Sequence, residues 1–171
     1  MSDTTSEGAA TLPVAPVYLV FSGDFLLDGP LKRVYQHVLN YPSWQNYTAV
    51  EHVSGERGEE GELVILKKEE EGFSFPPYYA RTIKIEPERR LIWKVYPTEQ
   101  GIEGDFFGIV DFKVRQEGEQ TRFSYNAIYE FQVPFQSESD LDRFRSEQSS
   151  NFEALFSSVF PKLKQLVATS A

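Results

Sequence analysis

The longest regular pattern of apolar residues lies at the C-terminal end of the chain, between Ser139 and Val167. Apolar side chains recur there mostly three or four residues apart, which places them on one face of an α-helix. They are Leu141, Phe144, Phe152, Leu155, Val159, Leu163 and Leu166. Gln148 occupies the gap in this stripe, so its amide is expected to point inward. Pro161 lacks a backbone N–H, so a kink or short break is expected near Ser157.

Before that helix, apolar and polar residues alternate in short stretches separated by Gly, Pro and charged residues, a pattern typical of antiparallel strands. The expected strands are Val17–Phe25, Ala49–Ser54, Glu62–Lys68, Tyr78–Glu86, Leu91–Tyr96, Asp105–Arg115 and Thr121–Phe131. Two short helices are expected after the first strand. Leu31, Val34, Tyr35 and Val38 form the buried stripe of one, with Asp28 as its cap, and Ser43 to Tyr47 form a turn that buries Trp44. The pattern predicts an α+β fold with seven strands and a long terminal helix.

Length and composition indicate one domain. The chain has 171 residues, of which residues 1–16 are small and polar and are expected to be a disordered tail. Residues 17–168 are expected to form a single domain. No second linker or internal repeat divides them.

Charge and residue usage exclude several classes of function. The formal net charge is −9 and the pI is about 4.8, which argues against a nucleic-acid or anionic-membrane partner. No apolar run is long enough to cross a membrane, and the N-terminus lacks the features of a secretion signal. The chain contains no cysteine, which excludes disulfides and thiolate metal sites. These features together predict a cytoplasmic protein.

Motifs for metal or nucleophilic chemistry are also missing from the sequence. The two histidines, His37 and His52, stand apart and have no partners at metal-ligand spacing. No Gly-x-Ser-x-Gly elbow is present, and the glycines at 101, 104 and 108 are not followed by the Lys-Ser/Thr of a phosphate loop. We therefore expect no metal site and no cofactor.

Two segments resemble those of a known superfamily. A helix followed by Asn40-Tyr41-Pro42-Ser43-Trp44, and the hairpin Ile85–Trp93 with its Pro87 turn, are similar to segments of the helix-grip proteins. This superfamily, also called SRPBCC, includes START lipid-transfer domains, pollen-allergen-type proteins and polyketide cyclase/dehydrase-like proteins. Asn40 stands where many relatives have Asp. The resemblance implies a curved seven-stranded antiparallel sheet wrapped around the long C-terminal helix, with a cavity for a hydrophobic ligand between them.

Alternation along the strands predicts which side chains face that cavity, provided that each strand keeps its register. Ile83 and Ile85 are assigned to the core, which places Arg81 and Tyr79 on the same inward face. Gly108 is expected to leave room in the interior. The predicted ligand-binding residues are Trp93, Phe106, Gly108, Tyr129, Gln148 and Phe152, and the predicted catalytic residues are Arg81, Tyr79 and Tyr125.

Each of these residues also has a purely structural interpretation. Arg81 can lie at the rim with its guanidinium in solvent or paired with a carboxylate, because an unpaired buried charge is costly. Tyr125 and Tyr129 can be core aromatics, Trp93 can be structural, and Gln148 can bond a sheet carbonyl.

The resemblance leaves two functions open, and a third is weaker. A polyketide cyclase, aromatase or dehydratase would use Arg81 to stabilise an enolate or carboxylate and Tyr79, Tyr125 or Tyr129 to transfer protons. A carrier or sensor for a lipid-like molecule would use Arg81 to anchor the polar head. A chaperone-activator-like interaction module would have no true cavity. The expected partner is a small hydrophobic molecule, and the chain is expected to be a monomer or a homodimer.

Overall fold

The computed structural model describes residues 12–45, 47, 49–70, 73–98 and 106–169. Its elements in chain order are β1 (Val14–Leu27), α1 (Leu31–Leu39), the 3-10 turn η1 (Tyr41–Ser43), β2 (Ala49–Ser54), β3 (Leu63–Glu70), β4 (Phe73–Glu86), β5 (Arg90–Pro97), β6 (Phe106–Glu117), β7 (Gln120–Pro134) and α2 (Glu138–Thr169).

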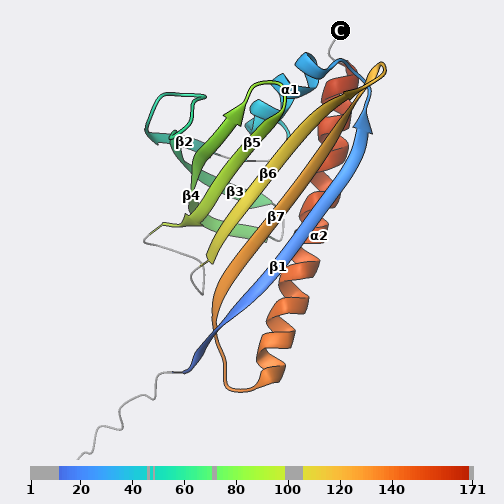
Figure 1. Ribbon diagram of the computed structural model, residues 1–171. Coiled ribbons are helices and arrows are strands. Elements are labelled where there is room, and N and C mark those ends of the chain that lie inside the picture. Colours follow the sequence, from blue (N-terminus) through green and yellow to red (C-terminus); the bar gives the residue numbers. More distant parts are fainter. Residues whose placement is uncertain (1–11, 46, 48, 71–72, 99–105, 170–171) are drawn as a thin grey trace, which may run out of the picture.

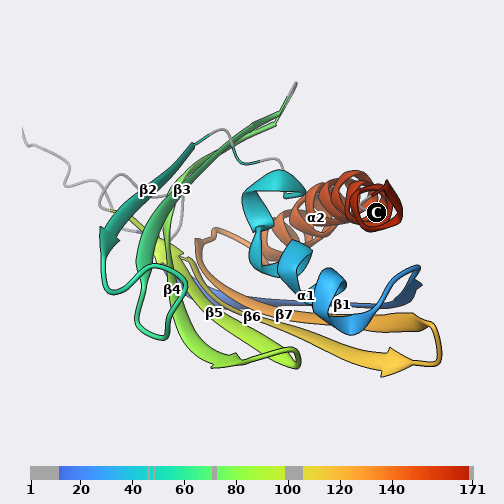
Figure 2. The ribbon, with the colours of Figure 1, turned by 90° about the horizontal axis from the view of Figure 1, so that it is seen from above.

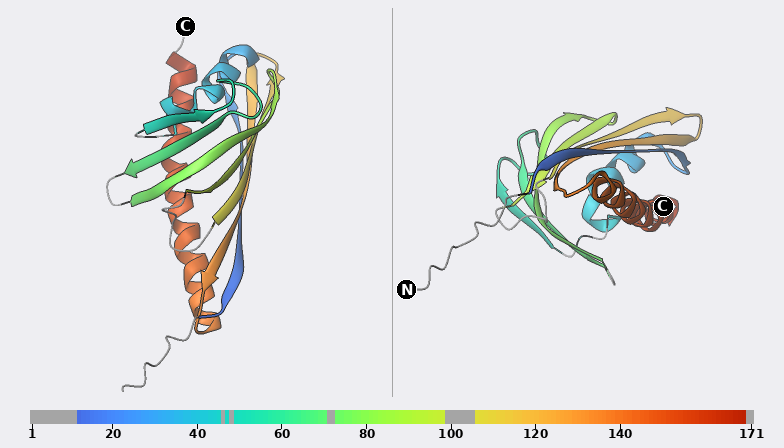
Figure 3. Two further views of the ribbon diagram at one scale, coloured as in Figure 1. Left: turned by 90° about the vertical axis from the view of Figure 1, so that its left-hand side faces the viewer. Right: turned by 90° about the horizontal axis from the view of Figure 1, so that it is seen from below.

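The strands form one antiparallel sheet in the order β1-β7-β6-β5-β4-β3-β2 (Figure 1). The sheet is strongly curved, and α2 lies in its concave side together with α1 and the turn that follows α1 (Figure 2). Further views show α2 running along the length of β1 and β7 (Figure 3). The predicted fold, a seven-stranded curved sheet around a long C-terminal helix with two short helices after the first strand, is confirmed.

The ends of the first strand and helix differ from the sequence-based prediction. β1 begins at Val14, which pairs with Pro134 of β7, so residues 14–16, which the sequence pattern assigned to the tail, belong to the first strand; residues 1–11 lie outside the described part. The first N–H of α1, at Leu31, donates to the Gln116 side chain over 2.7 Å. Asp28 instead accepts a hydrogen bond from Gln120. A side chain of the β6–β7 hairpin therefore takes the capping role that the sequence assigned to Asp28.

The long helix α2 is not interrupted at Pro161. The missing N–H leaves the carbonyl of Ser157 without its usual donor four residues later, but the helix continues to Thr169. At its start, Asp140 accepts hydrogen bonds from the N–H groups of Gln136 and Ser137, each at 3.0 Å. No helix in the described part is long and apolar enough to cross a membrane.

Trp44 fixes the turn after α1 to the core. Its side chain is only 1% exposed, and its Nε1–H donates to the backbone carbonyl of His37 over 2.9 Å. The indole meets the rings of Phe112 and Phe123 edge-on, with centroid distances of 5.9 and 6.2 Å. The expected burial of Trp44 by this turn is confirmed, and it closes one end of the space between the sheet and α2.

Candidate functional site

An aromatic cavity of about 70 Å³ lies between the concave face of the sheet and α2. The sheet contributes Tyr78, Trp93, Phe106, Phe112, Tyr125, Tyr129 and Phe131, α2 contributes Phe152, Leu155, Phe156, Val159 and Phe160, and the segment after α1 contributes Trp44, Gln45 and Tyr47. The volume is less than half of the ~150 Å³ that holds a benzene ring in an engineered protein cavity. Ring side chains therefore fill most of the space.

The polar groups of the cavity are uncharged. Within the described part of the chain, no Asp, Glu, Lys, Arg or His lines it. The polar groups of the lining side chains are the hydroxyls of Tyr47, Tyr78, Tyr125 and Tyr129, the amide of Gln45 and the indole N–H groups of Trp44 and Trp93. The hydroxyls of Tyr47 and Tyr78 lie 2.7 Å apart, and Tyr47 also donates to the Gln45 Oε1 atom over 3.1 Å. These hydrogen bonds fix the side chains at the end of the cavity that lies beside η1.

The hydroxyl of Tyr125 is buried and forms no hydrogen bond with any described residue. Its ring is 3% exposed and packs against Phe156 and Phe160, with centroid distances of 4.8 and 5.0 Å. A buried polar group without a partner costs about 1–3 kcal/mol. The cavity wall thus contains a buried hydroxyl, that of Tyr125, whose hydrogen-bonding capacity is not used by any described residue.

Burial controls the ionisation of these phenols. It raises the pKa values of Tyr47, Tyr78, Tyr125 and Tyr129 above their ordinary value of 10. Neighbouring phenols raise the pKa values of Tyr78, Tyr125 and Tyr129 further, whereas the hydrogen bond with Tyr78 partly offsets the rise at Tyr47. Burial also raises the pKa of the adjacent Tyr41 to about 12. A general base works best with a pKa near the working pH. The described part of the cavity wall therefore offers neutral hydrogen-bonding groups and no base that is active near neutral pH.

The structure brings five of the predicted site residues together around the cavity. Trp93, Phe106, Tyr125, Tyr129 and Phe152 all line it. The alternation of β5, β6 and β7 is regular over these positions, which is why side-chain parity located them. Their roles in binding or catalysis stay predictions.

The predicted inward positions of Arg81 and Tyr79 are wrong. β4 has a bulge: Thr82 pairs with Trp93 and Lys84 with Ile92, so Ile83 is an extra residue. One extra residue reverses the faces on its two sides. Ala80 and Thr82 are therefore buried and Arg81 is exposed.

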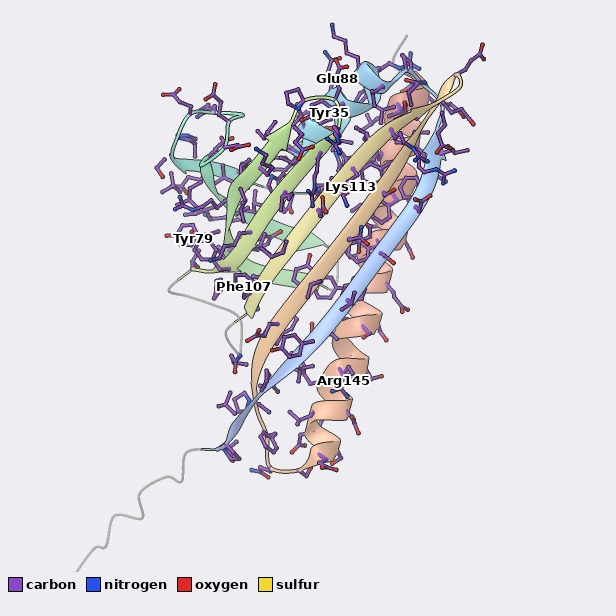
Figure 4. The ribbon with its side chains drawn as sticks, in the orientation of Figure 1. Tyr35, Tyr79, Glu88, Phe107, Lys113 and Arg145 are labelled. Atoms are coloured by element: carbon purple, nitrogen blue, oxygen red, sulfur yellow. The ribbon has the colours of Figure 1, made fainter. Side chains whose placement is uncertain are left out.

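Tyr79 lies on the same outer face as Arg81. Its ring packs on Tyr96 of β5, at a centroid distance of 5.3 Å. Figure 4 shows Tyr79 in front of the sheet with Phe107, while α2 lies behind it. Arg81 and Tyr79 consequently share no face with Tyr125.

Gly108 lies on the inward face as predicted, but neither Gly108 nor Gln148 is part of the cavity wall. A Cβ atom at Gly108 would lie 2.5 Å from Tyr129 Cδ1 and 2.7 Å from Val95 Cγ2. The room left by this glycine is thus taken by two neighbouring side chains. Gln148 is half-buried on α2 but is not part of the cavity wall.

Sequence reasoning missed other wall residues. Phe156 and Phe160 follow Phe152 at steps of four, and this spacing alone could have placed them on the same face of α2. The inward position of Tyr78 could be predicted only if the bulge in β4 were known. Gln45 and Tyr47 follow an irregular turn, where no periodicity applies.

Comparisons with known proteins show the fold. No protein-family model matches the chain, and neither does any curated protein. An uncharacterised protein from Rhizobium leguminosarum has a TM-score of 0.67 at 11% identity, covering 91% of this chain and 98% of its own. The major latex-like protein 151 of Panax ginseng has a TM-score of 0.57 at 14% identity, with coverages of 88% and 97%. The di-domain ARO/CYC protein BexL of the BE-7585A biosynthetic pathway has a TM-score of 0.63 at 14% identity, covering 90% of this chain and 51% of its own.

Proposed function

We propose that the protein binds a small, uncharged, mostly apolar molecule between the sheet and α2. The observation that carries this proposal is the buried Tyr125 hydroxyl, which has no partner among the described residues and sits in an aromatic wall. A ligand with a carbonyl, ether or hydroxyl oxygen would satisfy it. Charged ligand groups are disfavoured inside, because nothing in the described wall offers an opposite charge.

Binding must enlarge the cavity. Pockets for drug-sized ligands occupy about 300–1,000 Å³, whereas this cavity measures about 70 Å³. The ring side chains on α2 are the ones that can yield, since they are not tied by hydrogen bonds as Tyr47 and Tyr78 are. We therefore propose a carrier or sensor that opens around its ligand.

A cyclase-type enzyme is the second candidate, favoured by the similarity of fold to the ARO/CYC protein BexL. Of the three predicted catalytic residues, Tyr125 is the one in the cavity wall. Its raised pKa suits a hydrogen-bond donor to a developing enolate and not a base. Arg81 cannot serve this reaction from the outer face.

Filling the cavity should weaken binding. Leu155→Phe adds volume to a half-buried wall position on α2, and Ile128→Phe adds the same ring to the outer face, where Ile128 is 52% exposed. Fluorescence titration with the neutral fluorophore N-phenyl-1-naphthylamine should saturate for the wild type and Ile128→Phe. Leu155→Phe should bind at least about tenfold more weakly, a loss of about 1.4 kcal/mol. Thermal unfolding checks that each variant is folded.

The two tryptophans of the chain, Trp44 and Trp93, both line the cavity. Their emission should fall as the probe binds, which gives an independent readout. The proposal is wrong if the wild type shows no saturable binding, or if Leu155→Phe binds as the wild type does.

A further inference from the structure

A surface groove runs along the seam between β1 and α2, which lie side by side (Figure 3). Phe21, Gly23 and Phe25 of β1 form one side of it. Phe156, Phe160 and Lys164 of α2 form the other, and Tyr125 of β7 forms the floor. β1 is the last strand of the sheet and bonds to β7 on one side only.

Three ring side chains belong to both the groove and the internal cavity. Tyr125, Phe156 and Phe160 line each of them. Phe156 and Phe160 stack with a centroid distance of 5.5 Å, and both touch the Tyr125 ring. A shift of these rings would join the cavity to the groove.

Both sides of the seam contain a feature that permits such a shift. On β1, Gly23 presents no side chain to Tyr125; a Cβ there would lie 3.1 Å from Tyr125 Cδ1 and 3.8 Å from Phe160 Cε2. On α2, Pro161 directly follows Phe160 and leaves the carbonyl of Ser157 without its helical N–H donor. Bending of a helix concentrates at such positions.

The opposite end of the cavity is held more firmly. Tyr47 and Tyr78 are joined there by a hydrogen bond of 2.7 Å, and Tyr47 also donates to Gln45 Oε1 over 3.1 Å. Opening there requires breaking buried hydrogen bonds, whereas the rings at the seam are held by packing. The seam is thus the easier way in.

We propose that the seam between β1 and α2 is the entrance to the cavity and the second half of the binding site. Tyr125, Phe156 and Phe160 form a gate between the two halves. This inference rests on the proposed function and extends it by predicting the shape of the ligand. An uncharged ring-sized end lies against Tyr125, and a longer polar remainder lies in the groove, whose rim carries the exposed Glu153, Ser157 and Lys164.

A gate changes the rates of entry and exit together, whereas a wall contact changes mainly the exit rate. Phe160→Leu should raise the association rate constant of N-phenyl-1-naphthylamine about tenfold in stopped-flow fluorescence, and the dissociation rate constant at least as much, because Phe160 is also a cavity-wall contact. Gly23→Ala should lower both rate constants, because its methyl group blocks the movement of the Tyr125 ring. Gly23 does not line the cavity, so the dissociation constant of Gly23→Ala should change little.

Phe106→Leu is the matched control, because Phe106 lines the cavity but not the seam. It should leave the association rate unchanged. Unchanged association rates in both Phe160→Leu and Gly23→Ala, or a faster association in Phe106→Leu alone, would overturn the gate while leaving the binding function intact. Absence of saturable binding to the wild type would overturn both.

Discussion

Replacing Trp44 with alanine is expected to lower the free energy of unfolding by about 3–5 kcal/mol, the usual cost of removing a fully buried aromatic side chain. Trp44 is 1% exposed and joins the segment after α1 to Phe112 and Phe123 of the sheet. Its hydrogen bond to the carbonyl of His37 would also be lost. Urea denaturation followed by circular dichroism measures the change.

Tyr18→Ala is the control for this substitution. Tyr18 lies on the outer face of β1 and is 57% exposed, so its loss should change stability by less than about 0.5 kcal/mol. Equal effects of the two substitutions would contradict the anchoring role of Trp44.

Tyr125→Phe is expected to stabilise the free protein by about 1–3 kcal/mol, because it removes a buried hydroxyl that has no partner among the described residues. The same change should weaken the binding of a ligand that uses this hydroxyl by about 0.5–1.5 kcal/mol. A pair of ligands isolates the effect: 2-acetylnaphthalene carries a carbonyl acceptor, and 2-ethylnaphthalene does not. Only the first should lose affinity, as measured by calorimetry.

Tyr78→Phe provides the matched control within the cavity. Its hydroxyl is already bonded to that of Tyr47, so its removal should lower stability by about 0.5–1.5 kcal/mol. If Tyr125→Phe also destabilises the protein and affects both naphthalenes equally, Tyr125 is a packing residue and not a ligand contact.

The fold was predictable because its signals are local and repeated. Alternating segments define the strands, and the apolar stripe from Leu141 to Leu166 defines the helix. Each of these elements has one apolar face, and all of these faces can be buried in a single core. Alternation of side chains correctly predicted the inward faces of β5, β6 and β7, because no bulge interrupts the pairing of β5 with β6 or of β6 with β7.

The site was less predictable because a single extra residue controls it. The bulge at Ile83 depends on how β4 pairs with β5, and the residue types at this position do not predict a bulge. Ile83 and Ile85 look alike in sequence, yet Ile83 is 42% exposed and Ile85 packs against the core. Assigning both to the interior carried Arg81 and Tyr79 to the wrong face. The size of the cavity was also beyond the sequence, because it depends on how rings such as Tyr129 pack against Gly108.

The account depends most on where an apolar guest binds. The outer face of the sheet offers a competing surface, because Tyr18, Val20, Phe107 and Ile128 are exposed there. Nuclear Overhauser effects between bound N-phenyl-1-naphthylamine and the protein distinguish the two places directly. Contacts to the ring protons of Tyr125, Phe152 and Phe156 are the predicted result, and contacts confined to Tyr18, Phe107 and Ile128 would contradict it.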